Sequence, residues 1–396
     1  MSWEEKSLDE LGFIGRGKSK HRPRDAEHLY GGPYPFIQTG DVKRADLYVT
    51  SFSQTYSEAG LTQSKLWPRG TLCITIAANI AETAILGLDA CFPDSVIGFI
   101  ADESKCDARF MKYKFDTIKH QYQQVSQGAA QDNLSLEKLL AFKLTVQPVH
   151  VQRRIADALC WYDDLIENNR RRMALLEEAA RQLYQEWFVR LRFPGHEHTR
   201  IIDGVSEGWE IRRLGELAQT NRQMLAKGFD GEIEYVDIAS VAPGQITETM
   251  KYSFRDAPSR ARRLVKHGDV IWSCVRPNRR SYAMVWRPVD NLVVSTGFAV
   301  ITPMAVPPTF IYFATTTDKF VGYLENHARG AAYPAVVAAD FERAEVIVPS
   351  RTLLEEFDGV ADPLFSEIHN LRLQNRGLRA ARDLLLPRVM SGEIAV

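Results

Sequence analysis

The chain has 396 residues, of which 45% are hydrophobic and 25% are charged, a balance typical of soluble globular proteins. It contains no run of 18 apolar residues, and its first residues do not resemble a signal peptide, so we expect a cytoplasmic protein without a membrane segment. The five cysteines are scattered without metal-ligand spacing, which argues against a zinc site and a disulfide framework. The length is sufficient for two or three domains, and the formal net charge of −1 indicates little by itself.

The first residues of the chain are repeated about two hundred positions later. Trp3-Glu-x3-Leu-x-Glu-Leu11 returns as Trp209-Glu-x3-Leu-x-Glu-Leu217. Further matches follow in the same order and at nearly the same offset. They pair 35–42 with 234–241, 67–76 with 265–274, 95–100 with 295–300, 127–130 with 329–332, and 146–148 with 346–349. A conserved order at one offset predicts a tandem duplication whose repeating unit is a whole domain.

Each repeat ends in a long amphipathic segment. Residues 148–193 carry an apolar stripe with a seven-residue period, and residues 350–396 carry a similar one. We expect two helices that pair as an antiparallel coiled coil, with Asn169 and Asn375 on or beside the seam to fix its register. Pro363 predicts a kink in the second helix or a delayed start. The expected seam residues are Ile155, Tyr162, Asn169, Leu176, Leu183, Phe357, Leu364, Leu371, Leu378 and Leu385.

The predicted layout is therefore a mixed globular unit, a long helix, a second globular unit and a second long helix. The corresponding segments are 1–147, 148–193, 194–349 and 350–396. Short strands opened by Gly turns alternate with short helices in each globular unit, so the expected fold class is α+β. Two such units separated by a rigid helical spacer could measure a distance on a ligand.

Basic segments occur in both halves and indicate nucleic-acid binding. The first runs from Arg16 to Arg24, and the region between Lys251 and Arg287 holds ten Lys or Arg against two Asp. Basic loops neutralise phosphates, and Arg, Asn and Gln can also contact base edges. The paired Gly-Ala-Ala loops add polar or stacking side chains, although a purely structural turn explains them equally well. The candidate contacts are Arg16, Lys18, Lys20, Arg22, Gln38, Thr39, Lys43, Gln131, Asn133, Arg262, Arg263, Arg276, Asn278, Arg279, Arg280, Arg329 and Tyr333.

Signatures of catalysis are scarce. The chain contains no phosphate-binding loop, no nucleophile elbow and no H-E-x-x-H motif. Asp94, Glu103 and Lys105 resemble a metal-dependent nuclease motif, but their spacing is short and the second repeat does not carry them. Two alternatives therefore stay open beside DNA recognition: a nuclease using these three residues, and a protein scaffold that never touches DNA.

The order of these motifs resembles the specificity (S) subunit of type I restriction–modification systems. The likeness rests on the duplicated openings, Tyr34-Pro-Phe-Ile with Gly40-Asp-Val42, the Gly128 and Gly330 loops, and Gln152-Arg-Arg-Ile-Ala156. It also rests on Leu176-Glu-Glu-Ala-Ala-Arg-Gln-Leu-Tyr-Gln-Glu-Trp-Phe188 and the ending Leu384-Leu-Leu-Pro-Arg-Val-Met-Ser-Gly-Glu-Ile394. The resemblance covers essentially the whole chain.

This resemblance implies that each globular unit is a target recognition domain for one half of a split double-stranded DNA site. The two helices would set the gap between the half-sites and dock two methyltransferase subunits. Those partners would bind S-adenosylmethionine and methylate adenine, and restriction subunits could join them. The resemblance implies no cofactor, metal or catalytic residue in this chain.

Overall fold

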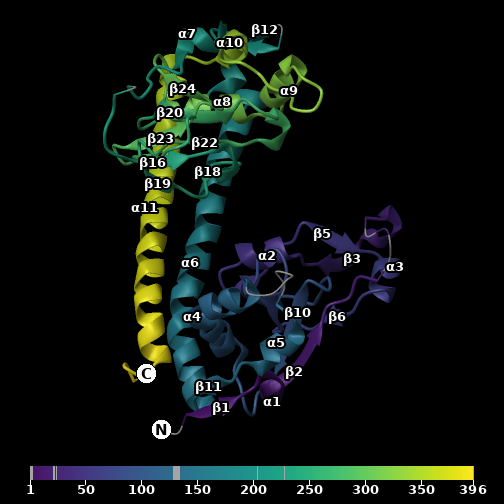
Figure 1. Cartoon of the computed structure of the whole chain (residues 1–396). Helices are drawn as coiled ribbons and strands as arrows, with labels where there is room; N and C mark the ends of the chain where they lie inside the picture. The colour runs from purple at the N-terminus through teal and green to yellow at the C-terminus, as the bar shows by residue number, and fades with distance from the viewer. Residues whose placement is uncertain are drawn as a thin grey trace. The chain divides into compact units, whose positions relative to one another are not determined.

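The computed structural model describes residues 3–20, 23, 25–127, 134–202, 204–226 and 228–395, and it divides into two compact units. Unit 1 comprises Met1–Asn168 with Gln374–Val396, and unit 2 comprises Asn169–Leu373. The long helices α6 (Val149–Tyr184) and α11 (Arg351–Met390) each contribute residues to both units (Figure 1).

Unit 1 contains two small sheets and a two-stranded pair. One sheet has the strand order β2-β10-β7-β8-β4, the other β5-β3-β9-β6, and β1 pairs with β11. The strands are β1 (Glu4–Lys6), β2 (Gly12–Arg16), β3 (Tyr30–Phe36), β4 (Tyr48–Val49), β5 (Gln54–Tyr56), β6 (Leu66–Trp67), β7 (Leu72–Thr75), β8 (Thr83–Leu86), β9 (Ala90–Cys91), β10 (Val96–Ala101) and β11 (Leu144–Val146). The shorter helices are α1 (Leu8–Leu11), α2 (Thr39–Arg44), α3 (Glu58–Thr62), α4 (Ala108–Gln127) and α5 (Leu136–Ala141).

Unit 2 repeats this arrangement with different loops. Its sheets have the orders β15-β24-β21-β22 and β19-β16-β23-β20, and β14 pairs with β25 as β1 pairs with β11. The strands are β14 (Glu210–Arg213), β15 (Ala218–Thr220), β16 (Glu232–Val236), β19 (Met250–Ser253), β20 (Ala261–Leu264), β21 (Val270–Ser273), β22 (Tyr282–Met284), β23 (Leu292–Ser295), β24 (Phe298–Pro303) and β25 (Glu345–Val348), with the pairs β12 (Ile201–Ile202) and β13 (Val205–Ser206), and β17 (Val241–Ala242) and β18 (Gln245–Ile246). The helices are α7 (Leu214–Leu217), α8 (Pro308–Thr316), α9 (Asp318–His327) and α10 (Ala338–Arg343).

The common topology of the two units confirms the predicted duplication. In unit 1 β3 pairs antiparallel with β5 and parallel with β9, and in unit 2 β16 makes the same two kinds of pairing with β19 and β23. The predicted Gly turns before the buried strands β7 and β21 are confirmed as well. Gly70 and Gly268 have φ angles of 88° and 86°, a region that favours glycine.

Segments of α6 and α11 contact each other within each unit. In unit 1, Arg382 forms an ion pair with Asp163, and Asn375 Nδ2 donates to the carbonyl oxygen of Ile166 at 3.2 Å. Residue numbers fall along α11 as they rise along α6, so these segments are antiparallel. Asn375 is buried and reaches a backbone oxygen of α6, which is the kind of contact that can fix a register.

The same direction holds in unit 2. Arg172 Nη2 lies 3.0 Å from Glu367 Oε1, and the rings of Tyr184 and Phe357 are 5.9 Å apart. After Tyr184 the helix continues as a π-helical turn, Gln185–Val189. The ten residues of the predicted seam are all buried or half-buried: Ile155, Tyr162, Asn169, Leu176, Leu183, Phe357, Leu364, Leu371, Leu378 and Leu385.

The expected delay at Pro363 is wrong, because α11 begins at Arg351 and continues as helix through the proline. A proline inside a helix costs about 3 kcal/mol, here by leaving the Gly359 carbonyl without its helical N–H donor. Phe357, Ala361 and Phe365 are buried on both sides of it. Packing of these side chains into the core of unit 2 outweighs the local cost.

Candidate nucleic-acid interface

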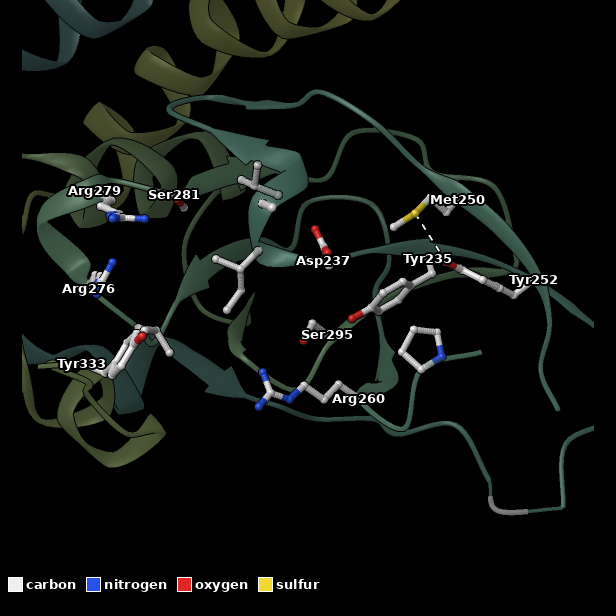
Figure 2. Close-up of a pocket in the computed structure, with 15 residues that line it drawn as sticks. Tyr235, Asp237, Met250, Tyr252, Arg260, Arg276, Arg279, Ser281, Ser295 and Tyr333 are labelled. Atoms are coloured by element: carbon white, nitrogen blue, oxygen red, sulfur yellow. Dashed lines mark hydrogen bonds between the residues drawn. The ribbon is translucent and has the colours of Figure 1, made fainter. Parts of the chain in front are cut away.

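A groove of about 1030 Å³ opens on unit 2 and carries a surplus of positive charge. Arg260, Arg276 and Arg279 line it together with Asp237 and Tyr333 (Figure 2). Since three guanidinium groups face one carboxylate, the groove favours an anionic ligand. Phosphates and the electronegative edges of bases are such ligands.

The loop at one side of the groove is held in an unusual conformation. Arg276 and Arg280 bracket the 3-10 turn Pro277–Arg279 and have φ angles of 51° and 53°, values uncommon for residues other than glycine. The Arg276 N–H donates to the Pro334 carbonyl oxygen at 2.7 Å. Such conformations persist where surrounding contacts enforce them, and they concentrate at functional sites.

The Gly330 loop supplies the aromatic face of the groove. Gly330 has a φ angle of 103°, and the Arg329 N–H and carbonyl oxygen both bond to the backbone of Ala335 at 2.9 Å. Tyr333 is 69% exposed at the tip of this loop, and the Arg276 guanidinium lies 4.6 Å from its ring centre. The functional interpretation of this loop, which the sequence left balanced against a structural turn, gains support from Tyr333 and Arg276 facing each other (Figure 2).

Several lining residues were not among the predicted contacts. Arg260 directly precedes β20. Tyr235 belongs to β16, Asp237 follows that strand, and Tyr252 belongs to β19. Asp237 Oδ1 accepts hydrogen bonds from the N–H and Oγ of Ser240, both at 3.0 Å. The alternation of buried and exposed residues along a strand could have pointed to Arg260, but the role of the two tyrosines depends on strand pairing that the sequence does not specify.

Other predicted basic residues of unit 2 have contacts elsewhere. The Arg262 guanidinium lies over the ring of Phe254 at 4.5 Å, and Arg280 forms an ion pair with Asp318. Arg263 donates to the Asn221 side chain and to the Phe298 carbonyl oxygen, and burial lowers its pKa. The groove is not lined by Arg262, Arg263 or Arg280. Asn278 and Arg329 are exposed and also lie outside its lining.

The candidate residues of unit 1 are more dispersed. Arg16 Nε donates to the Asp94 carbonyl oxygen, the Lys20 N–H donates to Gln63 Oε1 at 2.6 Å, and Gln38 Nε2 donates to Gln54. The side chains of Lys18 and Lys43 are exposed and Thr39 is half-buried at the start of α2. Arg22, Gln131 and Asn133 lie outside the described residues.

One unpredicted cation lies in unit 1. Lys65 Nζ is 3.8 Å from the ring centre of the buried Trp67, and burial together with the charge of Lys18 lowers its pKa. Lys65 Nζ also lies over the ring of Phe13 in β2, 4.5 Å from its centre. The isolated position of Lys65 in the sequence gave no signal of this.

Two of the three residues of the alternative nuclease motif contact residues outside it. Lys105 Nζ pairs with Asp102 Oδ2 at 3.0 Å, and the Glu103 carbonyl oxygen accepts a hydrogen bond from Arg153. Within the described ranges no group of three His, Cys, Asp or Glu is arranged to hold a metal ion. Likewise, in that part of the chain no helix has the length and apolarity needed to cross a membrane.

Together, the duplicated α+β domain, the long helices and the basic aromatic groove define a protein of the nucleic-acid-recognition class. Residues 1–178 match the family of the type I restriction modification DNA specificity domain. This match covers the first repeat and most of α6, and over these residues the chain is similar to type I restriction–modification specificity subunits.

Individual specificity subunits are also similar to this chain. The chain is 22% identical to the type I restriction enzyme MjaIX specificity subunit of Methanocaldococcus jannaschii, over all of this chain and 94% of the relative. It is 23% identical to the HindI specificity subunit of Haemophilus influenzae over 40% of this chain and 36% of the relative. The crystal structure of a type I S subunit from M. genitalium superimposes with a TM-score of 0.56 at 15% identity, covering 98% of this chain and 96% of that one. This likeness shows that the fold is shared.

Proposed function

We propose that this chain is the DNA specificity subunit of a type I restriction–modification complex. Each globular unit reads one half of a split double-stranded target, and the chain itself performs no catalysis. The observation that carries the proposal is the groove of unit 2, in which Arg260, Arg276 and Arg279 accompany exposed Tyr333 on a domain whose topology unit 1 repeats.

The helices α6 and α11 have two roles in this proposal. They set the gap between the half-sites, and they dock two methyltransferase subunits. Those subunits bind S-adenosylmethionine and methylate adenine, while restriction subunits join the complex where the system has them. The antiparallel contacts of α6 and α11 inside each unit are compatible with a rigid spacer of this kind.

Methylation mapping of genomic DNA by long-read sequencing tests the proposal. Cells that express the neighbouring methyltransferase are compared with and without the gene for this chain. We expect methylated adenines in a two-part motif with a fixed gap, and we expect the motif to vanish on deletion. Unchanged methylation in cells that demonstrably express both proteins would contradict the proposal.

Charge reversal separates DNA recognition from a scaffold role. Arg279→Glu should weaken binding of the assembled complex to its target, because a repulsive charge replaces a phosphate-binding one. Arg351→Glu is a matched control, since Arg351 is 92% exposed at the start of α11 and does not line the groove. Equal affinity of both variants and the wild type would favour a scaffold.

A further inference from the structure

The three arginines of the groove differ in how firmly their side chains are held. Arg276 Nη2 donates to the Ala332 carbonyl oxygen at 3.2 Å, and its guanidinium lies over the Tyr333 ring. In the part of the chain that the structure describes, the guanidinium groups of Arg260 and Arg279 make no hydrogen bond or ion pair. The Arg276 guanidinium is therefore pre-positioned, whereas those of Arg260 and Arg279 can change their orientation when a ligand binds.

The backbone below Arg276 is fixed as well. Val275 and Ala335 form an isolated antiparallel bridge, and the Val336 N–H donates to the Cys274 carbonyl oxygen at 2.9 Å. These bonds tie the Arg276 loop to the Gly330 loop and enforce the left-handed conformation of Arg276. A side chain held at both its backbone and its guanidinium loses little freedom when it binds a ligand.

We propose that Arg276 is a specificity-determining residue that reads a guanine in the half-site recognised by unit 2. A fixed arginine fork matches the O6 and N7 acceptors of guanine in the major groove, and no other base presents two acceptors there in this pattern. Exposed, unheld arginines suit phosphates instead, because attraction to a phosphate needs charge and not one fixed orientation. Arg260 and Arg279 are assigned to the DNA backbone. This inference rests on the proposed function.

Tyr333 is the positioning residue for Arg276. The Arg276 guanidinium lies over its ring, 4.6 Å from the ring centre, and we expect the N–H groups that do not bond to Ala332 to remain available for a base. This stacking needs the aromatic ring and not the hydroxyl group. Tyr333→Phe should therefore keep the function of Arg276, and Tyr333→Ala should lose it.

The test uses the complete complex of this chain with its methyltransferase subunits. Its affinity is measured for duplexes that carry the mapped target and for duplexes in which each base pair is replaced in turn. Arg276→Lys keeps the charge but removes the fork. We expect it to lose about tenfold or more of the discrimination at one G·C pair, confined to one half-site, with unchanged salt dependence.

Arg279→Ala is the matched control. We expect it to weaken binding to all duplexes by a similar factor and to lower the slope of log affinity against log salt by about 1. Tyr333→Ala should reproduce the effect of Arg276→Lys at the same base pair, and Tyr333→Phe should retain wild-type discrimination.

Three results for the Arg276→Lys complex would overturn the inference. It could discriminate between base pairs at every position as the wild type does, or it could lose discrimination equally at all positions. It could also lose discrimination only at positions that are not G·C pairs. Failure of the proposed function has a different signature, since the wild-type complex would then prefer no split target at all. The two failures are thus separated by the wild-type measurement alone.

Discussion

Arg382 of α11 and Asp163 of α6 form an ion pair inside unit 1 in which the carboxylate is only 2% exposed. The Tyr113 hydroxyl of α4 donates to the same carboxylate, and burial together with the nearby charge of Asp163 raises the pKa of Tyr113. Three elements of unit 1 thus meet at one buried carboxylate. Unit 2 has a counterpart, in which the Tyr312 hydroxyl of α8 donates to Glu177 of α6 at 2.5 Å.

Removing one partner of this pair should destabilise unit 1 strongly. Arg382→Leu leaves the Asp163 carboxylate buried without its cation, which costs about 3–5 kcal/mol. Urea unfolding of the full chain, followed by circular dichroism, measures the loss. Arg388→Ala is the control, since its pair with Glu393 is more than half exposed and should contribute less than about 1 kcal/mol. Similar losses for the two variants would argue against a stabilising role for the buried pair.

An exposed tryptophan on α6 predicts a contact with the methyltransferase. Trp161 is 70% exposed, and Leu165, one turn further along, is 43% exposed. Large aromatic side chains commonly dominate the binding energy of interfaces. Under the proposed function, Trp161→Ala should weaken methyltransferase binding by about 2 kcal/mol, or roughly thirtyfold, without changing the unfolding midpoint.

The affinity for the purified methyltransferase subunit, measured by calorimetry, checks this prediction. Val289→Ala is a suitable control, because Val289 is similarly apolar and 42% exposed but belongs to a loop of unit 2. If Trp161→Ala binds as the wild type does, the methyltransferase contacts another surface.

The run Arg260-Ala-Arg262-Arg263 shows what sequence reasoning could and could not give. The sequence predicted a basic segment there, but the structure gives its three arginines three different environments. Arg260 lines the groove, Arg262 packs over Phe254, and Arg263 bonds to groups inside the fold. A side chain's partner depends on which strand lies beside it, and neighbouring residues in a strand point in opposite directions.

The different environments of Arg260 and Arg263 give a prediction with two measurements. Arg263→Met should destabilise unit 2 by about 2–3 kcal/mol, because the Phe298 carbonyl oxygen loses its Arg263 donor and Asn221 Oδ1 keeps only the Val300 N–H. Arg260→Ala should leave stability unchanged and lower the salt slope of DNA binding by about 1. Urea unfolding and salt titration of DNA affinity measure the two effects. The reverse pattern would place Arg263, and not Arg260, at the DNA.

The domain duplication was more accessible to sequence reasoning than the site. Matches in one order, such as Trp3 with Trp209 and Gly70 with Gly268, reflect strands and turns that both units need in order to fold. The loops that carry Arg276 and Tyr333 are not required for folding in both units, so the repeat does not reveal them. The contact between these two residues is seen only in the structure. Pro363 is a similar case, because distant packing outweighs a local helix-breaking preference.

The pH dependence of stability should reveal the cap of α10. Asp340 Oδ2 accepts the Val337 N–H at 2.9 Å, Oδ1 accepts from Arg343 Nη2 at 2.6 Å, and the carboxylate is 1% exposed. Burial by itself raises the pKa of Asp340, but these hydrogen bonds and the Arg343 charge outweigh it and lower the pKa below its ordinary value of 3.8. A carboxyl with a lower pKa in the folded state stabilises the fold fully above the unfolded pKa, and this contribution is lost as the pH falls through the folded pKa.

Asp340→Asn should therefore be less stable than the wild type by about 1–2 kcal/mol at pH 7, since it loses the charged cap. The difference should begin to shrink below about pH 4, where Asp340 of the unfolded wild type takes up a proton, and it should disappear as the pH falls through the lower pKa of the folded state. Urea unfolding of both proteins at pH 7, 4 and 3 provides the measurement. Asp318→Asn is the control, because Asp318 is 88% exposed beside Arg280 and its loss should matter little at any of these pH values. A deficit of Asp340→Asn that stays constant from pH 7 to 3 would mean that the geometry of the cap, and not its charge, stabilises α10.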